Sequence, residues 1–242
     1  MSRFRQLRLL SWQDSARMAL RFPRTALHML RDCGGHRGPT PFPRRLGLFL
    51  TNRCDFDCPM CAVKDVRFES RHADLPFEFV ESVLSECGRY QPVVDLIGGE
   101  PLLYPRLPDA VRTARRHNVL AVVTTNGLKL KERAEALVEA GLPLLQISVD
   151  GWDEHSEAAR GRVAGSFARL REGIGAVLAA RGARTFPFIR VLTAITRVNH
   201  GHLDRIQQAI AAWGVRYWGI SNYFYLNRSA QESHREFALL MA

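Results

Sequence analysis

The sequence predicts an α/β protein whose strands are parallel and form a partial (β/α)6 barrel of the TIM type. Short runs of leucine and β-branched residues alternate with amphipathic segments over roughly residues 46–222. The apolar runs are continuous, which is typical of strands that are buried on both faces of a parallel sheet. Six strands and five intervening helices follow from this pattern.

The expected elements alternate in order along the chain. Apolar runs predict strands over residues 46–50, 93–97, 119–124, 144–149, 188–195 and 215–220. Between them, amphipathic patterns predict helices over residues 77–87, 107–117, 129–140, 166–180 and 203–213. Functional sites of β/α folds lie at the carboxyl ends of the strands, so the residues that follow each strand are the first candidates.

Composition narrows the class of protein. With 242 residues and 46% hydrophobic content, the chain is long enough for one sizeable core, and no stretch approaches the length of a membrane span. The cysteines suggest no disulfide framework, which indicates a reducing, cytoplasmic location. Cys87 lies on an apolar helical pattern and is expected in the core, and Cys33, beside two glycines, is expected on the surface. No internal repeat and no specific nucleic-acid motif is evident.

The net charge of +10 is concentrated near the N-terminus. Residues 1–50 contain ten arginines, and their only acidic residues are Asp14 and Asp32. We therefore divide the chain into a basic helical extension (1–44), the barrel (45–222) and a short C-terminal helix or tail (223–242). The extension is helical in pattern from about Trp12 to Leu30. Its role stays open between an amphipathic membrane-surface anchor, an electrostatic patch for an acidic peptide or polyanion, a transit-like segment, and a helix that packs under the barrel.

Three cysteines lie within eight residues directly after the first expected strand. Cys54, Cys58 and Cys61 have the spacing C-x3-C-x2-C. A [4Fe–4S] cluster needs four ligands, so a loop with three thiolates leaves one iron open for a small molecule. The alternatives are a dithiol redox motif at Cys58 and Cys61, or a zinc site completed by His72.

The second and third strands also end in residues that suit a ligand. A Gly-Gly-Glu-Pro turn, residues Gly98, Gly99, Glu100 and Pro101, follows the second strand. Glycines allow a backbone to approach a ligand closely, and the glutamate supplies a carboxylate that can accept an ammonium group. Taken alone, the turn could be structural only. Asn126, at the end of the third strand, is either a turn residue or a ligand-binding residue.

Together, the cysteine spacing and the later Gly-Gly-Glu-Pro turn resemble the radical S-adenosylmethionine enzymes over roughly residues 46–222. The resemblance implies that Cys54, Cys58 and Cys61 hold a [4Fe–4S] cluster. It further implies that the fourth iron is chelated by S-adenosylmethionine, whose amino group is bound by the turn at residues 98–101. Met60 takes the place of a residue that is often aromatic in the family and packs near the adenine.

The later strand ends extend the resemblance. The Ser-x-Asp-Gly formed by Ser148 and Asp150 is similar to that of peptide-modifying members, and strand alternation would place both side chains on the same side. Arg160 matches an arginine that commonly follows this strand and would neutralise the ligand's carboxylate. Ile195 would form an apolar wall near the adenine.

The resemblance also implies an activity. An electron from a donor such as flavodoxin or ferredoxin would cleave S-adenosylmethionine to a 5′-deoxyadenosyl radical, which abstracts hydrogen from a peptide or small-molecule substrate. The alternative is a cluster- or zinc-binding partner protein without catalysis. Many peptide-modifying relatives continue into a domain with further cysteines, whereas this sequence has none after Cys87. Either one cluster suffices or the sequence stops short of a further domain.

Overall fold

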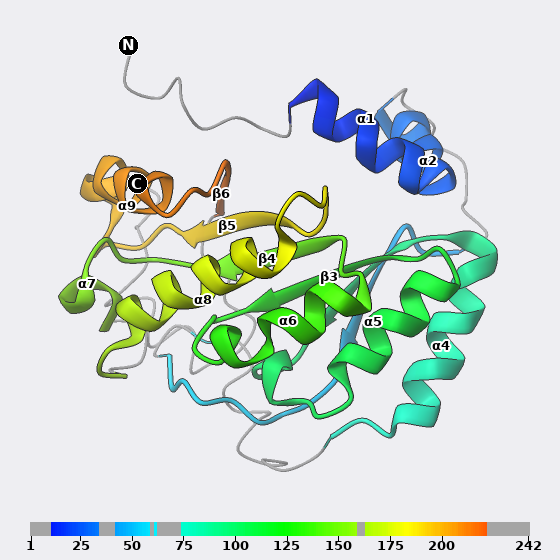
Figure 1. Cartoon of the computed structure of the whole chain (residues 1–242), viewed down its shortest axis with the longest axis horizontal. Coiled ribbons are helices and arrows are strands. Elements are labelled where there is room, and N and C mark those ends of the chain that lie inside the picture. The colour runs from blue at the N-terminus through cyan, green and yellow to red at the C-terminus, as the bar shows by residue number, and fades with distance from the viewer. Residues whose placement is uncertain (1–10, 34–41, 59–60, 62–73, 159–162, 222–242) are drawn as a thin grey trace.

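The structure, a computed structural model, describes residues 11–33, 42–58, 61, 74–158 and 163–221. Its centre is one sheet of six parallel strands in the order β1-β2-β3-β4-β5-β6 (Figure 1). The strands are β1 (Arg45–Phe49), β2 (Val93–Ile97), β3 (Leu120–Thr125), β4 (Leu144–Ser148), β5 (Phe188–Ala194) and β6 (Tyr217–Ser221). The predicted fold class is confirmed, and each predicted strand lies within two residues of its observed bounds.

Helices connect successive strands. They are α4 (Phe77–Tyr90), α5 (Leu107–Arg116), α6 (Leu130–Ala140), α8 (Ser166–Arg181) and α9 (Leu203–Ala212). The strand-end loops add three short helices that the sequence pattern did not predict: η1 (Pro101–Leu103), α7 (Glu154–Ala158) and η2 (His200–His202). In Figure 1, α4, α5, α6 and α8 lie side by side along one face of the sheet, which we call the outer face.

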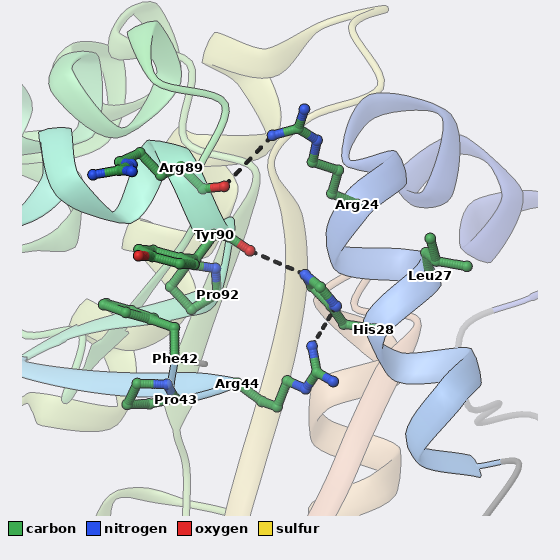
Figure 2. Close-up of a pocket in the computed structure, with 9 residues that line it drawn as sticks. All are labelled: Arg24, Leu27, His28, Phe42, Pro43, Arg44, Arg89, Tyr90 and Pro92. Carbon is green, nitrogen blue, oxygen red and sulfur yellow. Dashed lines mark hydrogen bonds between the residues drawn. The ribbon is translucent and has the colours of Figure 1, made fainter. Parts of the chain in front are cut away.

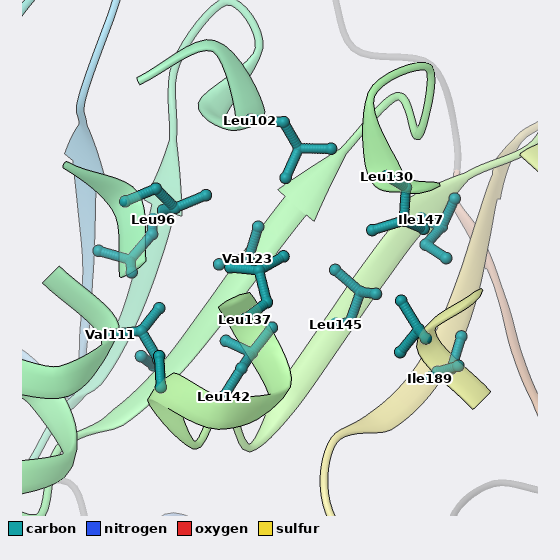
Figure 3. Packing of buried hydrophobic residues seen from close by; sticks show 14 of the residues in the cluster. Leu96, Leu102, Val111, Val123, Leu130, Leu137, Leu142, Leu145, Ile147 and Ile189 are labelled. Atoms are coloured by element: carbon teal, nitrogen blue, oxygen red, sulfur yellow. The ribbon is translucent and has the colours of Figure 1, made fainter. Parts of the chain in front are cut away.

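The main core lies between these helices and the outer face. Alternate strand residues such as Leu96, Val123 and Leu145 are fully buried there, against helix residues that include Val111 and Leu137 (Figure 3). The remaining strand residues line the opposite, inner face, since successive side chains of a strand point to opposite sides. The side chains of the outer face therefore form the core, and those of the inner face are left to form a site.

The N-terminal extension forms two helices, α1 (Trp12–Arg21) and α2 (Pro23–Cys33), where the sequence suggested one continuous helix. The break falls at Phe22 because Pro23 has no N–H to continue the hydrogen-bond ladder, and proline is tolerated only in the first turn of a helix. Phe22 is 3% exposed and packs against Val93, Leu120 and Val122 at the beginnings of β2 and β3. The extension thus covers the amino-terminal end of the inner face.

Hydrogen bonds fasten α2 to the loop between α4 and β2. The hydroxyl of Thr25, which is 3% exposed, donates to the carbonyl oxygen of Gln91 at 2.8 Å. His28 contacts the carbonyl oxygen of Tyr90 through Nε2 at 3.1 Å, and Arg44 contacts its Nδ1 (Figure 2). A carbonyl only accepts, so Nε2 carries the hydrogen and Nδ1 accepts from Arg44. Of the four alternatives for the extension, these contacts support packing.

A buried polar pair fastens α1 to the last strand. The hydroxyl of Tyr217 donates to the carboxylate of Asp14, which is 7% exposed. This bond holds the pKa of Asp14 below its ordinary value, and burial together with Asp14 raises the pKa of Tyr217 to about 12. The outward side of the extension leaves large apolar side chains exposed, chiefly Trp12, Leu20 and Leu30. None of the described helices is both long enough and apolar enough to cross a membrane.

Candidate functional site

A cavity of about 200 Å³ lies at the carboxyl ends of β2, β3 and β4. It collects the cysteine motif, the glycine turn and the ends of the neighbouring strands in one place. Its lining residues are Cys54, Phe56, Cys58, Cys61, Ile97, Gly98, Gly99, Glu100, Thr124, Thr125, Asn126 and Ser148. The structure therefore brings together eight of the thirteen residues that the sequence singled out.

The cysteine loop leaves β1 through a set of polar anchors. Thr51 donates its hydroxyl hydrogen to Asp74 at 2.6 Å, and Arg53 forms an ion pair with the same carboxylate at 2.7 Å. Arg53 also donates to the carbonyl oxygen of Leu103 at 2.6 Å. Within the motif, the N–H of Cys61 donates to the carbonyl oxygen of Cys58 at 3.1 Å. The start of the loop is thus fixed to the rim of the barrel.

The two glycines allow the cysteine loop to lie directly against the end of β2. The N–H of Gly99 donates to the carbonyl oxygen of Thr51 at 2.7 Å. A Cβ atom would lie 2.4 Å from the Thr51 oxygen at Gly98, and 2.3 Å from the Arg53 oxygen at Gly99. No side chain fits at such distances from backbone atoms. The two glycines are therefore needed for the close contact between the end of β2 and the backbone of the cysteine loop, whether or not they also allow a ligand to come close.

Glu100 is the most buried polar group of the cavity wall, with 1% of its surface exposed. One carboxylate oxygen accepts from the N–H of Leu102 at 2.9 Å and the hydroxyl of Thr125 at 2.6 Å. The other accepts from the N–H of Asn126 at 2.7 Å. Burial raises the pKa of Glu100 to about 7, although these bonds oppose the shift. Glu100 thus joins the ends of β2 and β3, and its contact with an ammonium group stays a prediction.

Asn126 connects the end of β3 to the cysteine loop. Its Nδ2 donates to Oδ1 of Asp55 at 2.7 Å, and its side-chain oxygen accepts from the N–H of Leu128 at 2.9 Å. Oδ2 of Asp55 is buried and has no hydrogen-bond partner among the described residues. An unpaired buried carboxylate oxygen is costly, which makes it a natural acceptor for a bound ligand.

Of the remaining predicted residues, one lines the cavity, two lie elsewhere at the strand ends, and two are outside the described residues. Ser148 ends β4 and lines the cavity, whereas Asp150 lies beyond the strand, where alternation no longer governs its direction. The carboxylate of Asp150 accepts from the N–H of Ala194 at 2.7 Å and so joins the ends of β4 and β5. Ile195 donates its N–H to the Ser221 oxygen at 2.9 Å and is not part of the cavity lining. Met60 and Arg160 lie outside the described residues.

The donor set suits an iron–sulfur cluster better than a single ion. The side chains of Cys54, Cys58 and Cys61 are partly exposed and line one cavity. Within the described part of the chain, no three His, Cys, Asp or Glu side chains converge on one metal ion. The ligands of a [4Fe–4S] cluster do not need to converge in this way, since each thiolate binds a different iron.

The family model of the Radical SAM superfamily matches residues 48–208. The chain belongs to this superfamily. The match runs from β1 into α9 and so contains the cysteine motif, the glycine turn and the ends of β3 to β5. The prediction of a [4Fe–4S] cluster and S-adenosylmethionine as cofactors is thereby confirmed at the level of the family.

Curated relatives include Fe-coproporphyrin III synthase of Methanosarcina barkeri, 32% identical over 50% of this chain and 31% of its own length. Another is GTP 3',8-cyclase 2 of Pseudomonas aeruginosa, 33% identical over 71% of this chain and 53% of its own length. The chain thus spans about half the length of such relatives, or less. Among solved structures, Streptococcus suis SuiB bound to S-adenosylmethionine superposes with a TM-score of 0.66 at 16% identity. That likeness covers 86% of this chain and 47% of SuiB and shows the shared fold.

Sequence reasoning missed the residues that hold the motifs in place. These are Thr51, Arg53, Asp55, Asp74 and Thr125. The only sequence signal was the position of Asp55 inside the cysteine motif and of Thr125 beside Asn126. Asp74 lies far from the cysteines in the sequence and carries no local signal, since its role depends on the return of the chain to the end of β1.

Proposed function

We propose that the protein is a radical S-adenosylmethionine enzyme that acts on a peptide or small-molecule substrate. The observation that best supports this proposal is that three cysteine side chains and the Gly-Gly-Glu turn line the same cavity at the carboxyl ends of the strands. This is the position of active sites in β/α barrels. The proposal rests further on membership of the superfamily and on relatives whose names are those of enzymes.

Each group of residues has a role in this proposal. Cys54, Cys58 and Cys61 would hold a [4Fe–4S] cluster. The backbone of Gly98 and Gly99 and the carboxylate of Glu100 would bind the methionine end of S-adenosylmethionine, and Ser148 would contact its methionine or ribose end. Met60, Pro101, Asn126, Asp150, Arg160 and Ile195 remain proposed cofactor contacts. When bound, the cofactors supply a 5′-deoxyadenosyl radical on one-electron reduction, and the barrel orients the reactants and excludes water.

The partners and the domain division are part of the same proposal. The electron would come from a donor of the flavodoxin or ferredoxin type. We propose that residues 45–222 carry the chemistry, that residues 1–44 support the barrel, and that residues 223–242 form a separate tail.

The decisive experiment is anaerobic reconstitution of the full chain with iron and sulfide. We expect about four irons and four sulfides per chain and release of 5′-deoxyadenosine from S-adenosylmethionine after reduction with dithionite. Replacement of Cys54, Cys58 and Cys61 by alanine should abolish both. Cys87→Ala is the matched control, because this thiol is fully buried in the core and its pKa is raised by that burial.

The outcomes separate the candidate functions. A stable cluster without 5′-deoxyadenosine release would support the non-catalytic partner protein. One zinc per chain, lost in the same triple variant, would support a zinc site instead. Retention of the iron–sulfur chromophore in the triple variant would exclude these cysteines as the ligands.

A further inference from the structure

The inner face of the sheet carries a row of polar side chains that runs from Thr124, in the wall of the cluster cavity, to Arg190. Thr124, Gln146 and Arg190 are direct neighbours on β3, β4 and β5. Arg190 donates to Oε1 of Gln146, whose Nε2 donates to the hydroxyl of Thr124 at 3.3 Å. Gln146 is only 5% exposed. A partly buried guanidinium group is thus held in place by a buried amide.

Arg190 forms no ion pair with the described residues, although the charge of Asp95 acts on it. Its Nε is buried and has no hydrogen-bond partner, and Gln146 is neutral. Both carboxylate oxygens of Asp95, however, are engaged in an ion pair with Arg45. Burial and the charge of Arg45 lower the pKa of Arg190, although a guanidinium remains protonated. Two arginines and one aspartate leave one positive charge uncompensated.

A cavity of about 260 Å³ lies beside these two arginines. The sheet and the helix pair α1–α2 enclose it from opposite sides. Apart from the arginines, Ser15 and Thr25, the lining is apolar: Met18, Ala19, Phe22, Ala26, Met29, Val93, Leu120, Val122 and Leu144. The side chain of Arg45 is 59% exposed, so the cavity is open to solvent at this end.

We propose that this cavity binds a small monocarboxylate with an apolar body. The carboxylate would accept from the guanidinium group of Arg190, which lines the cavity, since charge-assisted hydrogen bonds to carboxylates are the ones that guanidinium groups favour. One uncompensated charge matches a monoanion better than a phosphate dianion. The apolar body would lie against Phe22, Val122 and Leu144. Neither the cluster nor S-adenosylmethionine takes part, so this inference stands independently of the proposed function.

The test compares 3-phenylpropionate with its neutral analogue 3-phenylpropanamide on the full chain, without a cluster, by isothermal titration calorimetry. We expect the acid to bind at least tenfold more tightly than the amide. Arg190→Gln should weaken binding of the acid at least tenfold and leave binding of the amide unchanged. Arg171→Gln removes an exposed charge on α8 and should leave both affinities unchanged.

A second variant tests the cavity without touching the arginine. Ala26→Leu should fill space in the cavity and weaken both ligands, while circular dichroism confirms that the fold is kept. Equal binding of acid and amide, or unchanged acid binding in both variants, would overturn the proposal. Inorganic phosphate is the third probe, and tighter binding of phosphate than of the acid would contradict the monocarboxylate class.

Discussion

The two ends of the inner face show opposite ways to build a cavity. At the carboxyl end, polar atoms and backbone form the walls, and Glu100 satisfies three donors at once. At the amino end, apolar side chains from α1 and α2 close the space, and Arg190 keeps an unpaired N–H. The hydrogen bonds at the carboxyl end fix the geometry of the loops. The wall at the amino end is stabilised by burial of apolar surface, which is not directional, so the shape of that cavity can vary more.

This difference has an energetic consequence. Loss of a bond in the polar wall leaves a buried donor or acceptor unsatisfied, which costs about 1–3 kcal/mol. Loss of a large apolar side chain at the other end leaves a cavity and exposes the sheet. We therefore expect variants at the amino end to change global stability and variants at the carboxyl end to change the metal-binding loop.

The largest effect on stability is expected from Phe22→Ala. Phe22 is 3% exposed between the extension and the starts of β2 and β3, and truncation of such a residue costs roughly 3–5 kcal/mol. Urea unfolding measures the change, with Leu20→Ala as control because Leu20 is 83% exposed. A variant that begins near Pro43 lacks Phe22 and the rest of the extension, so we expect it to be unstable for the same reason.

The next effect is a pH dependence that Glu100 confers. A carboxyl group whose pKa is raised to about 7 in the folded protein binds more protons there than in the unfolded chain. Its contribution to the free energy of unfolding therefore falls as pH rises from about 4.5 to about 7, by on the order of 3 kcal/mol. Glu100→Gln should remove this slope from urea unfolding of the cluster-free protein. This substitution should also lower the free energy of unfolding at every pH. The side-chain NH2 of the glutamine would take the place of a carboxylate oxygen and would face hydrogen-bond donors instead of accepting from them.

The exposed Glu132 provides the control for this measurement. Its side chain is 66% exposed, and Glu132→Gln should leave the pH dependence as it is in the unchanged protein. An identical slope in the Glu100→Gln variant would show that the buried carboxyl group is ionised throughout this range.

Gly99→Ala should have a smaller effect on stability and a large one on the cysteine loop. The new Cβ would lie 2.3 Å from the Arg53 carbonyl oxygen, and overpacking of this kind costs roughly 1–3 kcal/mol. We expect reconstituted iron content to fall while the far-ultraviolet spectrum is unchanged. Gly175→Ala in α8 is the matched control, since nothing lies within 4 Å of its added Cβ. Alanine there should stabilise the helix by up to about 1 kcal/mol.

The smallest effect is expected from Thr25→Val, which removes the hydroxyl bonded to the Gln91 carbonyl oxygen and keeps the shape. One such hydrogen bond contributes about 1 kcal/mol, measured as a shift of the urea midpoint. A loss much greater than this would mean that α2 contributes to the polar framework as well as to apolar packing.

The sequence by itself determined the elements and the motifs. The strand positions follow from continuous apolar runs, because burial on both faces demands them. The spacing of Cys54, Cys58 and Cys61 selects a cluster-binding loop, since three ligands on one short loop leave few alternatives. These properties depend on residues that are neighbours along the chain.

Only the tertiary structure decided which side chains serve the site and which serve the scaffold. Glu100 turns into the protein because donors from η1 and β3 converge on it, and Asp55 is fixed by Asn126 from another strand. The unpaired N–H of Arg190 likewise depends on what β2, β4 and α1–α2 place around it. Such roles come from contacts between residues far apart in the sequence, and no local pattern encodes them.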